Sequence, residues 1–459
     1  MATHFDAIVI GAGQAGPSLV GRLAAAGRKV AMIERKLFGG TCVNTGCTPT
    51  KTMIASAYAA QMARRASSYG VTLSGGVAVD MKAVKARKDA ITGRSRGNIE
   101  SWLRGMQGCT VYTGHARFAA PHEIRVGDEL LTADQIFLNV GGRAVVPSLP
   151  GVDRISYFTN SNLLDLEEVP DHLVVVGGGY IGVEFAQMFR RFGSKVTIVE
   201  KSPVLMQHED EDVSSAITDI LKKEDIYLRT SAECIHFEPR GAQVTVGVSC
   251  TEGDPEVVGS HVLLAMGRRP NTDDLGLDKA GVKMDERDYI IVDDQLRTSV
   301  EGIWAMGDCN GRGAFTHTAY NDFEIVAANL LDNDPRRVSD RLPVYGLFTD
   351  PPLGRVGMTE REVRKSGLPA LMGTRPMTKV NRAVEKGESE GFMKVLVDAE
   401  TKQILGASIL GVGGDEAVHC IVDVMYARAP YTTIQRAVHI HPTVSELIPT
   451  VLGDLKPLQ

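Results

Sequence analysis

Two cysteines separated by four residues, Cys42 and Cys47, have the clearest capacity for chemistry in this sequence. They lie in GGTCVNTGCTPTK, where a glycine-rich loop leads into a helical pattern over 50–68, and Pro49 is typical of a first helical turn. We therefore expect Cys47 at or just before a helix N-terminus, where free amide dipoles favour a thiolate and lower the thiol pKa. Residues five apart on a regular helix point to different sides, so a bond between these sulfurs needs a distorted first turn. The spacing predicts a redox-active dithiol.

Two other uses of paired cysteines fit this sequence less well. A structural disulfide is disfavoured because no signal peptide precedes the pair and nothing indicates an oxidising compartment. A zinc site would need a second pair of ligands at short spacing. The other cysteines instead stand singly, at Cys109, Cys234, Cys250, Cys309 and Cys420. We therefore expect a redox pair and no bound metal.

The segment before the cysteines has the pattern of a dinucleotide-binding fold. Its parts are a strand over 5–10, the glycines Gly11, Gly13 and Gly16, a helix over 17–26, and a strand over 29–33 that leads into Glu34. The glycines permit a tight turn and close approach to a pyrophosphate, whose charge the helix N-terminus stabilises. Glu34 can accept hydrogen bonds from a ribose diol.

The same pattern occurs a second time. It comprises a strand over 173–176, the glycines Gly177, Gly179 and Gly182, a helix through 192, and a strand over 195–199 that leads into Glu200. Two such folds require two dinucleotides, unless one fold has lost its ligand. The first fold carries the dithiol, so its ligand must pass electrons to a disulfide. A flavin can accept a hydride and do this, which assigns FAD to the first fold and NAD(P) to the second.

The rest of the chain completes an α/β protein, with two Rossmann-like dinucleotide-binding domains and a C-terminal α+β domain. Between the two folds we expect a helix over 81–106, strands over 110–118, 122–126 and 129–131, and a linker over 147–151. From 344 onward, strand pairs and helices follow without a third fingerprint.

Composition limits the partners and the location. The chain has 459 residues, of which 43% are hydrophobic and 23% charged, with a formal net charge of −6. These values are typical of a globular protein with several domains. The negative charge argues against a nucleic acid or an anionic membrane as partner. The apolar runs are too short to span a bilayer, and a strand begins at Phe5 without room for a targeting segment. We expect a cytoplasmic protein.

The dithiol segment resembles the redox-active segment of the flavoprotein disulfide reductases, which include dihydrolipoamide dehydrogenase, glutathione reductase and mercuric reductase. Motifs similar to those of the family recur in order from Ile8 to Glu446, so the resemblance covers almost the whole chain. It implies that NAD(P)H reduces FAD, that FAD passes electrons to Cys47, and that Cys42 exchanges with a small disulfide. Segments 136–143 and 263–271 resemble the family's crossings out of and back into the FAD domain. The resemblance therefore places the domains at 1–149 (FAD and dithiol), 150–270 (NAD(P)), 271–342 (a return to the FAD domain) and 343–459. It also implies that the last of these is a dimerisation domain, in a homodimer whose subunits share active sites.

The resemblance further implies an acid–base pair. The segment HIHPTVSE places His441 and Glu446 on the family's His-Pro-Thr and Glu positions. Reduction of a disulfide releases a thiolate that must be protonated, and an imidazole titrates in the required range. A carboxylate bonded to the imidazole fixes its tautomer. His439 is the alternative histidine, which we interpret as structural because it does not precede the proline.

Other cofactor contacts are implied residue by residue. Lys51 and Glu184 match an ion pair near flavin N5, where a cation stabilises negative charge; a solvated lysine and a helix-capping acid are the alternative. Tyr180 matches a tyrosine that covers the flavin in glutathione reductase, and Asp308 matches the aspartate that binds the ribityl chain. The remaining implied contacts are Gly40, Thr41, Gly142, Gly267 and His317, the last of which has an ordinary packed histidine as its alternative.

The substrate is the least specified part of the prediction. Mercuric reductases carry a cysteine pair near the C-terminus, whereas this chain has no cysteine after Cys420. Glutathione reductase has adjacent arginines on its first helix, where this chain has Gly21 and Arg22. Dihydrolipoamide is therefore the default, next to another small disulfide. An FAD-dependent NADH oxidase or quinone reductase and a non-enzymatic flavin sensor are alternatives from other classes. Glu200 would repel a 2′-phosphate, so we expect NAD(H), with NADP(H) as the alternative.

Overall fold

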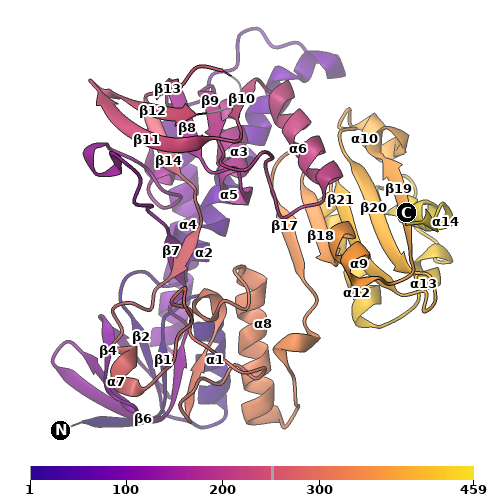
Figure 1. The fold of residues 1–459 in the computed structure, drawn as a ribbon. Coiled ribbons are helices and arrows are strands. Elements are labelled where there is room, and N and C mark those ends of the chain that lie inside the picture. The colour runs from indigo at the N-terminus through magenta and orange to yellow at the C-terminus, as the bar shows by residue number, and fades with distance from the viewer. Residues whose placement is uncertain (1, 250–252, 459) are drawn as a thin grey trace.

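The computed structural model describes residues 2–249 and 253–458. Figure 1 shows a first α/β domain at the lower left, a second α/β domain above it, and a C-terminal domain at the right. Helix α3 (Cys47–Arg64) packs against α4 (Met81–Arg104) and against α5 (Tyr180–Phe192) of the second domain. The helix that begins with the second cysteine is therefore shared between the two nucleotide folds.

The first sheet has the strand order β3-β2-β1-β6-β5-β4, and β16 pairs with β6. Its strands are β1 (Thr3–Ile10), β2 (Val30–Glu34), β3 (Cys109–Thr113), β4 (Ala116–Ala120), β5 (Glu123–Val126), β6 (Glu129–Leu138) and β16 (Ile303–Ala305). β1, β2, β3, β6 and β16 run parallel to one another, whereas β5 pairs antiparallel with β6 and with β4. The buried apolar residues of β1 and β2 suit a parallel sheet covered on both faces. Helix α1 (Ala15–Ala25) packs against α8 (Thr316–Ala327) on one face. Because β16 and α8 follow the second domain in sequence, the chain returns to the first domain.

The second domain has a parallel sheet in the order β10-β9-β8-β14, next to an antiparallel sheet in the order β11-β12-β13. The strands are β8 (His172–Val176), β9 (Lys195–Val199), β10 (Ile226–Arg229), β11 (Glu233–Arg240), β12 (Gln243–Ser249), β13 (Glu256–Gly259) and β14 (His261–Leu264). Helices α5 and α6 (Glu211–Lys223) are amphipathic and bury their apolar sides. β7 (Gly142–Ala144) pairs with β15 (Arg268–Pro270) where the chain leaves and re-enters the first domain.

The C-terminal domain is built on an antiparallel sheet in the order β17-β18-β21-β20-β19-β22. Its strands are β17 (Val344–Leu347), β18 (Leu353–Gly357), β19 (Ala370–Pro376), β20 (Phe392–Asp398), β21 (Ile404–Leu410) and β22 (Lys456–Pro457). Its helices are α9 (Glu360–Ser366), α10 (Asn381–Glu385), α11 (Gly414–Ala417), α12 (His419–Tyr426), α13 (Thr432–Gln435) and α14 (Ile448–Gly453). β20 and β21 supply much of the buried core of this domain.

Three predicted elements differ from the structure. The helix predicted over 50–68 begins earlier, at Cys47, and ends at Arg64 before a 3-10 turn. The strand predicted over 110–118 is two strands, because β3 pairs in parallel with β2 whereas β4 turns back against β5. The strand predicted over 129–131 continues to Leu138, because β6 stays in register with β1 along that length. Among the described residues, no helix is long and apolar enough to cross a bilayer.

Candidate active site

The first glycine turn brings the backbone of three segments together. A Cβ atom on Gly11 would lie 2.2 Å from the Asn139 carbonyl oxygen, and one on Gly16 would lie 2.2 Å from the Gly11 carbonyl oxygen. A Cβ on Gly40 would lie 2.7 Å from Gly13 Cα, which places the start of α2 (Gly40–Asn44) against this turn. Side chains are excluded here, so backbone amides and a helix N-terminus are left to meet a ligand, and a pyrophosphate fits this donor set.

The acid after β2 is built into the same turn. Glu34 Oε2 accepts a hydrogen bond from the Ala12 N–H at 2.8 Å, and Oε1 accepts from the Lys36 N–H at 2.8 Å. Each carboxylate oxygen has a further lone pair, so Glu34 can still accept from a ribose hydroxyl. The backbone bonds fix the carboxylate next to the glycine turn.

The second turn repeats this construction. A Cβ on Gly182 would lie 1.9 Å from the Gly177 carbonyl oxygen, and one on Gly177 would lie 2.4 Å from the Ala265 carbonyl oxygen. Gly179 is the N-cap residue of α5. Glu200 Oε2 accepts from the Gly178 N–H at 2.5 Å, and Oε1 accepts from the Ser202 N–H at 2.7 Å. The two predicted dinucleotide sites therefore have matching backbone geometry.

The two cysteines lie on separate helices with a break between them. Cys42 is on α2 and Cys47 is the first residue of α3, so the chain interrupts its helix at Thr45 and Gly46. This break provides the distortion that the five-residue spacing requires. Both are free thiols, as is every other cysteine that the structure describes; Cys250 lies outside the described residues.

The surroundings of the two thiols shift their pKa values in opposite directions. A hydrogen bond from the Cys42 thiol, together with Thr316 and the Lys51 ammonium, outweighs burial and lowers the pKa of Cys47 to about 6. The same hydrogen bond, together with burial, raises the pKa of Cys42 well above its ordinary value. Cys47 is therefore a thiolate near neutral pH and Cys42 holds the proton.

Lys51 and Glu184 form an ion pair one helical turn beyond Cys47. The Lys51 ammonium lies 2.7 Å from Glu184 Oε2, and the Glu184 side chain is 5% exposed. The backbone N–H of Phe348 donates to Glu184 Oε1 at 2.9 Å, and the Phe348 ring centroid lies 4.6 Å from Lys51 Nζ. Both carboxylate oxygens of Glu184 are thus occupied, which disfavours the alternative of a solvated lysine and a simple helix-capping acid.

Tyr180 lies near Glu184 and Cys47, and Asp308 lies near Tyr180. Tyr180 begins α5, and its ring packs against Phe315 at a centroid distance of 5.6 Å. Asp308 follows β16, and burial raises its pKa although the Arg268 guanidinium lies 3.4 Å away. Arg268 also donates to the carbonyl of Gly142 at 2.7 Å, so the β7–β15 crossing stands beside Asp308.

Sequence reasoning missed a contact at Cys47. Thr316 Oγ1 lies 3.2 Å from Cys47 Sγ, and Thr316 is the first residue of α8. The nearest indication in the sequence was His317, the next residue in the GAFTHTAYNDFEI segment. The His317 ring stacks on Phe315, and its Nε2 lies 2.6 Å from the Val344 carbonyl oxygen.

His441 and Glu446 form a pair that stands apart from the dithiol of the same chain. His441 Nδ1 lies 2.9 Å from Glu446 Oε2, and the His441 side chain is 68% exposed whereas that of Glu446 is 15% exposed. The segment between α13 and α14, which carries the pair, lies on the side of the C-terminal sheet remote from α2 and α3 (Figure 1). Neighbouring Val438 and Ile440 are also largely exposed. His439 Nδ1 lies 3.2 Å from the Ala437 carbonyl oxygen.

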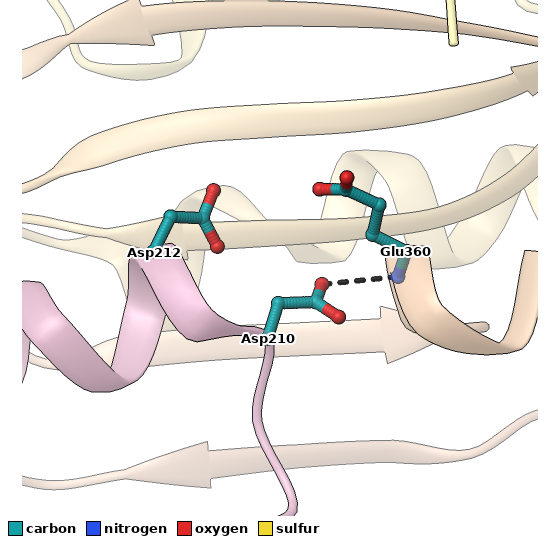
Figure 2. Close-up of side chains that lie close together, drawn as sticks. All are labelled: Asp210, Asp212 and Glu360. Atoms are coloured by element: carbon teal, nitrogen blue, oxygen red, sulfur yellow. Dashed lines mark hydrogen bonds between the residues drawn. The ribbon is translucent and has the colours of Figure 1, made fainter. Parts of the chain in front are cut away.

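A separate acidic cluster joins the second and C-terminal domains. Asp210, Asp212 and Glu360 bring carboxylate oxygens within 4.8 Å of one another (Figure 2). The buried Lys394 ammonium lies among them, at 3.0, 2.8 and 3.1 Å respectively. Because an ammonium already supplies the positive charge, this cluster is an ion-pair network between domains and not a site for a metal.

Comparisons with known proteins agree with this geometry. The pyridine nucleotide-disulphide oxidoreductase family model matches residues 5–322, and the dimerisation domain of the same family matches residues 344–452. The chain is 36% identical to a probable pyridine nucleotide-disulfide oxidoreductase, RclA, of Escherichia coli K12, covering 98% of this chain and 99% of that protein. It is 31% identical to a mercuric reductase of Streptomyces lividans (97% and 95% covered) and 31% identical to a dihydrolipoyl dehydrogenase of Chlamydia muridarum (96% and 95% covered).

A solved structure gives the same result. The Cu(II) complex of the HOCl-induced flavoprotein disulfide reductase RclA from Escherichia coli superposes with a TM-score of 0.90 at 34% identity, over 99% of both chains. The chain therefore belongs to the pyridine nucleotide-disulphide oxidoreductase family, is an oxidoreductase with a C-terminal dimerisation domain, and uses the FAD and NAD(P)H of that family.

Proposed function

We propose that this protein passes electrons from a nicotinamide dinucleotide through FAD to the Cys42–Cys47 pair and on to a small disulfide. The observation that carries the proposal is the low pKa of Cys47 beside the Lys51–Glu184 pair, at a helix shared by two dinucleotide folds. Bound FAD supplies a carrier that takes a hydride and passes electrons to a disulfide. The net reaction converts NAD(P)H, a proton and a disulfide into NAD(P)⁺ and two thiols.

The environment of each sulfur assigns its role. Cys47 contacts Thr316 and lies near Lys51, so we assign it to the cofactor side, although it is the more exposed thiol. Cys42 is then the exchange thiol. Its raised pKa means that it keeps its proton, so it needs a base before it can attack the substrate disulfide.

We assign this base to His441 of a second subunit. His441 would take the Cys42 proton as the Cys42 sulfur attacks the substrate disulfide, and would return it to the departing thiolate. Cys47 then attacks the Cys42 sulfur, which re-forms the Cys42–Cys47 disulfide and releases the second half of the substrate as a thiolate. This thiolate takes up the proton of the net reaction from solvent. Glu446 holds the imidazole through Nδ1 and leaves Nε2 for the proton. The segment between α13 and α14, which carries His441, lies remote from α2 and α3 of its own chain (Figure 1), and this supports a homodimer in which each C-terminal domain completes the partner's site.

The remaining assignments follow the same plan. We retain the domain limits 1–149, 150–270, 271–342 and 343–459. We assign the FAD contacts to Gly11, Gly13, Gly16, Glu34, Gly40, Thr41, Lys51, Gly142 and Asp308, and those of the nicotinamide dinucleotide to Gly177, Gly179, Gly182, Glu200, Gly267 and Tyr180. The Gly178 and Ser202 N–H groups hold the Glu200 carboxylate, which we expect close to the position of a 2′-phosphate. The two negative charges would repel each other, which supports NAD(H) as the preferred dinucleotide.

The substrate we propose is a low-molecular-weight disulfide, with lipoamide as the first compound to test. Cu(II) is the second candidate, because a solved structure of the Escherichia coli relative is a Cu(II) complex. The test is a steady-state assay of NADH and NADPH against lipoamide, glutathione disulfide, other small disulfides, quinones, mercuric ion and Cu(II). The proposal is wrong if the unmodified enzyme reduces no disulfide and the Cys42→Ser variant still reduces quinones.

A further inference from the structure

Phe348 contacts both members of the Lys51–Glu184 pair from a third domain. It follows β17 and lies in the turn that leads to β18, so it belongs to the C-terminal domain. Its backbone N–H donates to Glu184 Oε1 at 2.9 Å, and its ring centroid lies 4.6 Å from Lys51 Nζ. The backbone and the ring of one residue therefore hold the acid and the cation separately.

The turn that carries Phe348 is fixed to α5 by further polar contacts. Gln187 Nε2 donates to the Asp350 carbonyl oxygen at 2.9 Å, and the Asp350 N–H donates to Gln187 Oε1 at 2.7 Å. Arg191 Nη1 lies 2.6 Å from Asp350 Oδ2 and Arg191 Nη2 lies 2.7 Å from Glu224 Oε1, and the Arg191 side chain is 7% exposed. Glu184, Gln187 and Arg191 lie on one face of α5, because they are three and four residues apart. The position of the ring relative to Lys51 is thus set by α5.

The ring restricts the direction of the Lys51 ammonium. An ammonium has three N–H donors on a flexible four-carbon chain, and one donor is taken by Glu184. The negative face of an aromatic ring attracts a cation within about 6 Å of its centroid. With Glu184 and Phe348 each holding the cation, fewer orientations remain, and one donor is left for a third group.

We propose that Phe348 is a positioning residue that holds the Lys51 ammonium in place for electron transfer. The inference rests on the proposed role of Lys51 beside the flavin. It gives the C-terminal domain a function within its own subunit, in addition to the contribution of His441 to the partner.

The test uses the FAD-loaded protein with Phe348→Leu, Phe348→Tyr, Lys51→Met and the double variant Lys51→Met/Phe348→Leu. Phe348→Leu keeps the backbone N–H and removes the ring. The rate constant of flavin reduction by NADH is measured by rapid mixing. We expect it to fall roughly 5- to 30-fold in Phe348→Leu, the range of a partly desolvated cation–π contact, and to recover in Phe348→Tyr. Phe392→Leu on β20 is the matched control, with no expected change. In the double variant, the loss of the ring should add nothing to the loss of the lysine.

A second readout follows the thiolate without turnover. The Lys51 ammonium is among the groups that lower the pKa of Cys47, so a displaced ammonium should raise the pH at which the thiolate–flavin absorbance of the two-electron-reduced enzyme appears. Phe348→Leu should move this midpoint toward that of Lys51→Met. Two results would show that the inference is wrong while the role of Lys51 stands, provided that Lys51→Met slows flavin reduction. In the first, Phe348→Leu reduces its flavin as fast as the unmodified enzyme. In the second, Phe348→Leu slows Lys51→Met by the same factor by which it slows the unmodified enzyme. If Lys51→Met itself has no effect, both fall.

Discussion

The Cys47 sulfur lies 3.2 Å from the hydroxyl of Thr316, 269 residues away in sequence. The contact joins the N-terminus of α3 to the N-terminus of α8, so the free amides of two helices converge near one sulfur. Both helix ends favour negative charge, and the threonine hydroxyl can donate to a thiolate. Together with Cys42 and Lys51, this arrangement stabilises the charged form of Cys47.

Removal of the Thr316 hydroxyl should therefore raise the pKa of Cys47. The pKa of about 6 means that the thiolate is present above this pH and is protonated as the pH falls through it. A hydrogen bond to a charged group contributes about 1.5 kcal/mol or more, which corresponds to about one pKa unit. In Thr316→Ala, the midpoint of the long-wavelength thiolate–flavin absorbance should move upward by about that amount. Thr316→Ser keeps the hydroxyl and serves as control; an equal shift in both variants would assign the effect to the lost methyl group.

Replacement of either cysteine should separate the two proposed roles. Two-electron reduction of the unmodified, yellow protein should produce a long-wavelength band, which Cys47→Ser should remove. Cys42→Ser should keep the band, since the serine hydroxyl can still donate to the thiolate. Disulfide reduction should fall by more than about 100-fold in both variants because the exchange needs both sulfurs. Absorbance spectra and steady-state rates provide the measurement, and full activity in either variant would contradict the dithiol mechanism.

The preference for NADH over NADPH should depend on Glu200. Its carboxylate is fixed by the Gly178 and Ser202 amides, so it cannot turn away from a 2′-phosphate. We expect kcat/KM for NADH to exceed that for NADPH by about tenfold or more, the equivalent of one unfavourable charge contact of roughly 1.4 kcal/mol. Glu200→Gln should narrow the ratio mainly by improving NADPH. A higher kcat/KM for NADPH in the unmodified enzyme would overturn the assignment.

Loss of Lys394 should destabilise the contact between the second and C-terminal domains. Lys394→Met leaves the carboxylates of Asp210, Asp212 and Glu360 without their central cation, and removal of one partner of a buried ion pair costs about 3–5 kcal/mol. Urea unfolding should show this loss. Lys223→Met is the control, because its ion pair with Glu390 is exposed on both sides and contributes less than about 1 kcal/mol.

The pH dependence of this stabilisation follows from Asp210. Burial raises its pKa, but hydrogen bonds from the Glu360 N–H and from Lys394 outweigh it and leave the pKa below its ordinary value. A carboxyl group with a lowered pKa in the folded state stabilises the fold above its unfolded pKa, near 4, and loses this contribution as the pH falls through the folded value. The difference between the unmodified protein and Lys394→Met should therefore shrink below about pH 4. A difference that stays constant into acid would exclude this account.

Local patterns in the sequence were enough to predict the two nucleotide folds. Each glycine turn, helix and terminal acid lies within about thirty residues, the length of a βαβ unit, so spacing alone specified them. The sequence also predicted a helix start close to Cys47, the first residue of α3, because Pro49 is typical of a first helical turn. The extra residues at that start depend on the break at Gly46, which the pattern does not encode.

Contacts between distant segments could not be predicted in the same way. Thr316 reaches Cys47 because the N-terminus of α8 meets that of α3, and Phe348 reaches Lys51 because the β17–β18 turn is bonded to α5. Neither residue carries a motif, and threonine and phenylalanine have many ordinary uses. The role of Lys394 could not be predicted either. A lysine in an apolar strand is expected to be solvated, and only the structure shows its three carboxylate neighbours.

A mixed dimer should show whether the two halves of the active site come from different subunits. The segment between α13 and α14, which carries His441 and Glu446, lies on the side of the C-terminal sheet remote from α2 and α3 of its own chain. The apolar neighbours Val438 and Ile440 are exposed. A two-fold interface would place this segment at the partner's Cys42. Cys42→Ser and His441→Gln chains, co-expressed with different tags and isolated as a mixed dimer, then contain one intact site and one doubly damaged site. About half of the unmodified activity should remain, by the site count of a two-fold assembly. A mixed dimer as inactive as each parent would place both groups in one subunit and contradict the shared site.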